Sequence, residues 1–147
     1  MLFSSERPMP LPLERLVYES TATGSTESLL NLAAILAESQ RNNDRRGLTG
    51  VLAAHRDCYV QVIEGPAAEL DALLRRLALD PRHRDLKVIE RQPIAERAFG
   101  GWSMASPRID AGTRAALDRL MTVPAPSGAA IVSLLREALA AERPQAA

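Results

Sequence analysis

Apolar residues recur at the spacing i, i+3, i+4, i+7 twice in this sequence, over residues 29–36 and again over residues 70–77. This spacing is typical of an amphipathic helix that buries one face. Strand-like runs precede, separate and follow the two helices, at residues 13–20, 48–54, 59–63 and 86–89. The predicted order is therefore β-α-β-β-α-β, which is the split βαβ or ferredoxin-like arrangement. We expect an α+β sandwich in which both helices pack on one face of a mixed sheet.

Local signals mark the ends of these elements. Ser25 is expected to cap the first helix, because its hydroxyl can accept a bond from a free amide of the first turn. Residues 55–57 are expected to form the turn of a β-hairpin between the second and third strands. Pro66 is expected to start the second helix, and residues 80–81 to end it. A short fifth strand is predicted at residues 102–105, after a glycine pair.

The chain divides into three predicted parts. Residues 1–12 form an extended arm, because three alternating prolines forbid a helix there. Residues 13–105 form the main domain. Residues 106–147 form a C-terminal extension with two short amphipathic helices, at 112–121 and 128–142. The extension is too short to bury a core of its own, so it lies against the main domain, pairs with another subunit or frays.

Charge and cysteine content exclude several classes of protein. Lys plus Arg total 18 and Asp plus Glu total 18, whereas non-specific nucleic-acid binding and polybasic membrane anchoring both need a positive surplus. One cysteine excludes an intrachain disulfide framework, and with two histidines it argues against a Cys/His metal site. No apolar run is long enough to span a membrane, and no secretory signal is visible at the start. We expect a cytoplasmic protein that binds no metal, membrane or nucleic acid.

Polar residues on inward faces are the candidates for function, because the sequence contains no Gly-rich phosphate loop, no G-x-S-x-G and no H-E-x-x-H. Tyr18 lies on the inward face of the first strand, and Gln61 interrupts the apolar third strand. Asn42 and Asn43 extend the face of Ile35 at the end of the first helix. Taken singly, each is typical of an exposed or capping residue. Together they converge between sheet and helices, where buried polar groups need partners, so we predict a ligand with several donors and acceptors.

These residues lie in segments that resemble the BLUF family, whose members are blue-light sensors that use flavin adenine dinucleotide (FAD). The resemblance rests on the combination N-x-R-x-G-[LI]-T-G, Q-x-x-E-G-P and W-x-M, which here begin at Asn43, Gln61 and Trp102. Any one of these patterns alone would be weak. The matching segments, in the family's order and spacing, are residues 16–20, 42–50, 59–66, 80–83 and 97–104.

The resemblance implies that FAD binds non-covalently between the two main helices. Asn43 would pair with N3–H and the C4 carbonyl of the ring, since a carboxamide donates and accepts at once. Asn42 and Arg82 would approach the C2 carbonyl side, while Ile35 and Leu77 would sandwich the ring. The residues implied to bind the cofactor are Ile35, Asn42, Asn43, Leu77, Arg82 and His83, with Arg82 or His83 near the ribityl or phosphate entrance.

The resemblance also implies a photoswitch. Excited flavin would draw an electron and a proton from the phenol of Tyr18. Gln61, which lies between Tyr18 and the ring, would rotate or tautomerise, because the two ends of its amide share a shape and differ in hydrogen bonding. A stronger bond at the C4 carbonyl would then shift the absorption to the red. Trp102 and Met104 would exchange places and relay the signal to the C-terminal helices.

Such a chain is expected to be a photoreceptor and not an enzyme, because no product leaves. Its expected partners are a downstream effector protein and further copies of itself, as a homodimer or a higher oligomer. Tyr59 stands where the family usually has Phe, and it either replaces that ring or acts as a second electron donor.

Two other functions stay open from the sequence. One is a small ferredoxin-like hydrolase of acylphosphatase type, although residues 21–25 lack the arginine that such a phosphate loop needs. The other is a flavin-free dimerisation module with the same fold.

Overall fold

The computed structural model describes residues 12–142, so residues 1–11 of the predicted arm and residues 143–147 of the predicted extension lie outside the described residues. Within the described range, no helix is both long and apolar enough to cross a membrane. The elements, in chain order, are β1 Leu13–Ala22, α1 Leu29–Arg46, β2 Thr49–His55, β3 Cys58–Pro66, α2 Ala67–Leu77, β4 His83–Ile94, α3 Ala111–Met121 and α4 Gly128–Glu142.

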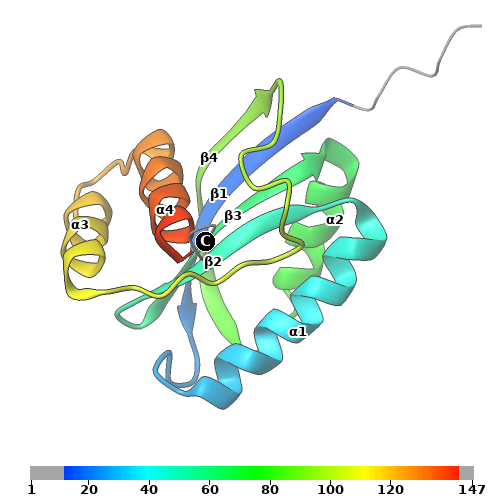
Figure 1. Cartoon of the computed structure of the whole chain (residues 1–147). Helices are drawn as coiled ribbons and strands as arrows, with labels where there is room; N and C mark the ends of the chain where they lie inside the picture. Colours follow the sequence, from blue (N-terminus) through cyan, green and yellow to red (C-terminus); the bar gives the residue numbers. More distant parts are fainter. Residues whose placement is uncertain (1–11, 143–147) are drawn as a thin grey trace, which may run out of the picture.

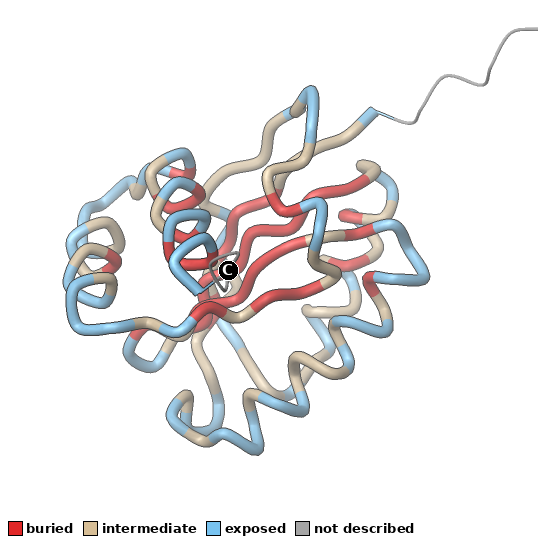
Figure 2. The backbone as a smooth tube through the Cα atoms, viewed as in Figure 1, coloured by how far each residue is buried: buried red, intermediate tan, exposed pale blue. Residues whose placement is uncertain are grey.

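The strands form one sheet with helices on both faces. The strand order is β2-β3-β1-β4, and every neighbouring pair is antiparallel. α1 and α2 cover one face, and α3 and α4 cover the other (Figure 1). Because side chains alternate along a strand, Leu16 and Tyr18 join the apolar layer under α1 and α2, whereas Val17 joins the layer under α3 and α4. The middle strands are therefore buried on both faces (Figure 2), and the predicted α+β, ferredoxin-like fold is confirmed. The expected mixed sheet is wrong, because all three strand pairs are antiparallel.

α1 differs from its predicted start. Its N-cap is Ser28, whose side chain accepts from the amide of Asn31 at 3.2 Å. The predicted cap, Ser25, instead accepts from the amide of Glu27 at 3.1 Å in the turn before the helix. Ser25 and Ser28 can both accept a hydrogen bond from a nearby backbone amide. Ser25 does so in the turn before the helix, and Ser28 caps the helix itself. The helix ends at Gly47, whose φ of 67° is the left-handed conformation that glycine adopts without strain.

The two predicted C-terminal helices are present. α3 is capped by Asp110, whose carboxylate accepts from the amide of Thr113 at 2.8 Å. Side chains of both helices, including Leu117 and Leu135, are buried in the layer against the sheet. The described part of the extension therefore lies against the main domain, which is one of the three placements expected for it.

The predicted fifth strand is wrong in part. Residues 102–105 run beside β2, but they make one isolated parallel bridge, between Val51 and Ala105, and the sheet of the described residues has four strands. The chain bends within this segment, so Trp102 packs in the layer of α3 and α4, whereas Met104 packs in the layer of α1 and α2. A regular strand would place both on one face. Side chains of α1 bind two carbonyl groups at the bend, those of Ser103 and Met104.

Candidate functional site

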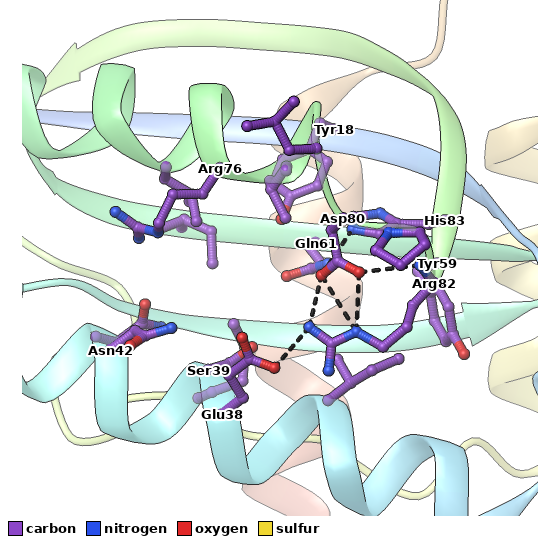
Figure 3. Close-up of a pocket in the computed structure, with 18 residues that line it drawn as sticks. Tyr18, Glu38, Ser39, Asn42, Tyr59, Gln61, Arg76, Asp80, Arg82 and His83 are labelled. Carbon is purple, nitrogen blue, oxygen red and sulfur yellow. Dashed lines mark hydrogen bonds and ion pairs between the residues drawn. The ribbon is translucent and has the colours of Figure 1, made fainter.

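A cavity of about 420 Å³ lies between α1, α2 and the sheet (Figure 3). Its walls combine apolar side chains from both helices with polar side chains from the strands and from the loop after α2. The lining residues are Tyr18, Ile35, Glu38, Ser39, Asn42, Asn43, Tyr59, Gln61, Ile63, Leu73, Arg76, Leu77, Leu79, Asp80, Pro81, Arg82, His83 and Met104.

Tyr18 and Gln61 form the floor of the cavity. They are direct partners in the antiparallel pairing of β1 with β3, which places their Cβ atoms about 5 Å apart on one face. Tyr18 is 1% exposed and Gln61 is 5% exposed. Burial raises the pKa of the Tyr18 phenol far above its ordinary value, the Asp80 carboxylate raises it further, and a hydrogen bond with Gln61 acts against both. Tyr18 therefore keeps its proton and holds it next to an amide that can donate or accept.

The end of α1 supplies two asparagines. Asn43 is 2% exposed, and its Nδ2 donates to the carbonyl oxygen of Ser103 at 2.5 Å. Asn42 is half-buried and lines the cavity. The helix is capped by the backbone of Gly47, whose amide bonds to the carbonyl of Asn43. The asparagine side chains are thus not needed as caps, which was the alternative explanation for them.

The loop after α2 closes one end of the cavity with a charged cluster. Nε and Nη2 of Arg82 donate to the two carboxylate oxygens of Asp80 at 2.9 and 2.5 Å, and Nη2 also lies 2.7 Å from Glu38 of α1 (Figure 3). These bonds hold the pKa of Asp80 below its ordinary value and raise that of Arg82. Nδ1 of His83 lies 2.8 Å from Oγ of Ser20, and burial lowers the pKa of His83. The charges at this end of the cavity are therefore already paired with one another.

Arg76 is a cavity residue that the sequence reasoning missed. Its Nη2 is buried and has no hydrogen-bond partner among residues 12–142. Burial lowers the pKa of Arg76, and the nearby Arg46 lowers it further. Arg76 lies three residues after Leu73 and one before Leu77, at the edge of the apolar stripe of α2, and this position was the signal available in the sequence. Arg76 lines the cavity, and a guanidinium in such a wall fits a carbonyl or phosphate oxygen of a ligand.

The structure brings together all the predicted site residues except one. Trp102 lies outside the cavity, in the layer of α3 and α4, while Met104 lines it. Tyr59 also lines the cavity and is buried, and burial raises the pKa of its phenol. Sequence periodicity places Tyr59 and Gln61 on one face, but it cannot reveal that the bend separates Trp102 from Met104.

The chemistry of the cavity fits a flavin. Its apolar walls include Ile35 of α1 and Leu77 of α2, which suit the faces of a flat ring. Its polar groups include the amides of Asn42 and Gln61, which suit the donors and acceptors at the edge of such a ring. The guanidinium of Arg76, which also lines the cavity, adds a cationic donor for an oxygen atom.

Comparison with known proteins agrees with this chemistry. The family model described as sensors of blue-light using FAD matches residues 13–105. The photoactivated adenylate cyclase subunit beta of Euglena gracilis is 35% identical over 95 residues, which are 64% of this chain and 11% of that protein. The corresponding subunit alpha of the same organism is 32% identical over 99 residues, which are 67% of this chain and 10% of that protein. This chain thus spans about a tenth of the length of these curated relatives.

Solved structures extend the similarity beyond residue 105. The dark-state structure of BlrB, described as a BLUF protein, has a TM-score of 0.73 and 31% identity, covering 92% of this chain and all of that one. The photo-activated state of BlsA has a TM-score of 0.74 and 25% identity, covering 91% of this chain and 99% of that one. Because the family model covers most of the chain and the cavity fits the family's cofactor, we conclude that the chain belongs to the BLUF family of flavin-binding blue-light sensors.

Proposed function

We propose that this chain is a blue-light photoreceptor in which Tyr18 and Gln61 form the photoswitch beside a non-covalently bound FAD. One observation carries the proposal: a buried phenol and a buried amide are register partners and line a cavity between two helices. Neither a hydrolase nor a flavin-free dimerisation module would give Tyr18 and Gln61 a role.

Residues of both helices would hold the cofactor. Ile35 and Leu77 would pack against the faces of the ring, and Asn42 and Asn43 would bind its polar edge. Nη2 of Arg76 would donate to a carbonyl or phosphate oxygen, because it has no hydrogen-bond partner among the described residues. The resemblance implied such a role for Arg82, but Arg82 would first have to release Glu38 or Asp80.

The chain's own chemistry would centre on one proton. Bound flavin absorbs blue light and, once excited, is a strong acceptor of electrons. Tyr18 would be the donor: an electron and the proton on Oη would pass to the flavin, and both would return to Tyr18 when the oxidised flavin is recovered. Gln61 is the register partner of Tyr18 and lines the cavity beside it. Rotation of the Gln61 amide exchanges a donor for an acceptor at the same position, which changes the bonding at the ring edge without changing the packing.

Signal output needs more than this one bond. Moving a population from 1:99 to 99:1 requires about 5.5 kcal/mol of differential interaction, whereas one neutral hydrogen bond contributes about 0.5–1.5 kcal/mol. We propose that a rearrangement around Trp102 and Met104 adds to it and that residues 106–147 pass the signal to an effector protein or a second copy. The cycle releases no product, so the chain would act as a receptor and not as an enzyme.

The test is the difference between the absorption spectra of the illuminated and the dark protein, purified with FAD. We expect a yellow protein whose absorption shifts to the red in blue light and returns in the dark. Tyr18→Phe should abolish the shift, and Tyr59→Phe is the matched control that should keep it. A protein that stays colourless after incubation with FAD would refute the proposal, and a shift that survives Tyr18→Phe would assign the donor role to another residue.

A further inference from the structure

The segment of residues 102–105 is held from two sides. Its two outer carbonyl groups accept from the backbone amides of Gly50 and Leu52 in β2, at 3.0 and 2.8 Å. Its two inner carbonyl groups accept from side-chain amides of α1, Gln40 at 3.1 Å and Asn43 at 2.5 Å. Four consecutive carbonyl groups are thus bound, the outer two to the sheet edge and the inner two to α1.

This pattern maintains the bend. In a strand fully paired with β2, Trp102 and Met104 would share a face. In the observed segment Met104 faces the cavity and Trp102 faces the layer of α3 and α4. The two inner carbonyl groups can point toward α1 only in the bent form, so the donors on α1 stabilise the bend against the regular strand.

We infer that Gln40 is a positioning residue that determines whether residues 102–105 are bent, and therefore which side chain of this segment faces the cavity. Asn43 shares the role but also lines the cavity, so its replacement would disturb ligand binding. Gln40 is exposed, does not line the cavity, and bonds to the carbonyl of Met104. Its part in signalling rests on the proposed photoreceptor function, but its effect on the segment does not.

The test compares three variants of the full chain without flavin. Gln40→Leu removes the donor at similar size, Gln40→Lys retains a donor, and Gln92→Leu makes the same chemical change on β4. Trp102 is the one tryptophan of the sequence, so its indole N–H gives a single probe in ¹H–¹⁵N spectra. We expect a second indole signal in Gln40→Leu, its population raised about two- to tenfold over the wild type, as loss of one hydrogen bond allows. Gln40→Lys and Gln92→Leu should resemble the wild type.

A wild-type indole spectrum in Gln40→Leu would overturn the inference, as would equal effects of Gln40→Leu and Gln40→Lys. The same variants loaded with FAD separate this inference from the proposed function. Gln40→Leu should keep the amplitude of the red shift and change the rate of its dark recovery by about two- to tenfold. Absence of any red shift in the wild type would refute the photoreceptor proposal and leave the indole comparison valid.

Discussion

Replacing Glu64 by Gln tests the anchor that fixes the chain leading into residues 102–105. Glu64 is fully buried at 0% exposure in β3. Its Oε2 accepts from Nε of Arg15 and from the amide of Ala98, both at 2.9 Å, and its Oε1 accepts from the amide of Phe99 at 2.8 Å. A glutamine can accept these bonds at one end only, so its NH₂ group must face at least one N–H donor.

The cost follows from these contacts. A buried amide of Phe99 left without its acceptor costs about 1–3 kcal/mol, and removing one partner of a buried ion pair costs about 3–5 kcal/mol. Because the two losses share one carboxylate, we expect a total of about 3–5 kcal/mol in the free energy of unfolding. For a domain of this size that lowers Tm by about 10 °C.

Urea unfolding of the wild type and Glu64→Gln, at one FAD concentration, measures this loss. Glu69→Gln is the matched control, because Glu69 pairs with Arg46 at 3.5 Å on the half-exposed surface. The control should change the free energy of unfolding by less than about 1 kcal/mol. A loss of under about 1 kcal/mol in Glu64→Gln itself would refute the reasoning, since a buried carboxylate with three donors cannot be that dispensable.

Three further predictions concern the cavity, α4 and pH. Arg76→Gln should weaken FAD binding by about tenfold or more, as expected for a charge-assisted bond, whereas the exposed Arg75→Gln should not; fluorescence titration measures both, and equal affinities would contradict the role of Arg76. Gly128→Ala should destabilise the chain by about 1–3 kcal/mol because the new Cβ meets the carboxylate of Glu90, and Glu90→Ala should relieve this loss in a double-mutant cycle. Folding lowers the pKa of His83, so the folded state binds fewer protons than the unfolded state, and stability should fall as pH drops below about 6.5. The Tm of His83→Asn should therefore fall less than that of the wild type between pH 7.5 and 5.5. If the two Tm values fall equally, groups other than His83 cause the loss of stability.

Sequence patterns that span only a few residues were sufficient to predict much of the secondary structure. The helical stripes predict both main helices, and alternation along a strand predicts the faces of Tyr18 and Gln61. These features depend on neighbours within a few residues, because helix and strand periods follow from backbone geometry alone. The start of α1 could not be predicted in the same way, since Ser25 and Ser28 offer equivalent hydroxyl groups.

Contacts between residues far apart in the sequence determined the features that the sequence patterns did not predict. The resemblance implied that Arg82 binds the ligand, but Arg82 is paired with Glu38 and Asp80, whereas Nη2 of Arg76 has no hydrogen-bond partner among the described residues. Trp102 and Met104 looked like one strand, but the chain bends between them, and two carbonyl groups at the bend accept from side-chain amides some sixty positions earlier. Periodicity carries no information about which carbonyl a remote side chain will reach. The sequence by itself therefore determined the main helices and strands, the shared face of Tyr18 and Gln61, and the family. The tertiary structure alone decided the path of residues 102–105 and which polar groups are paired, because both depend on partners that only folding brings within bonding distance.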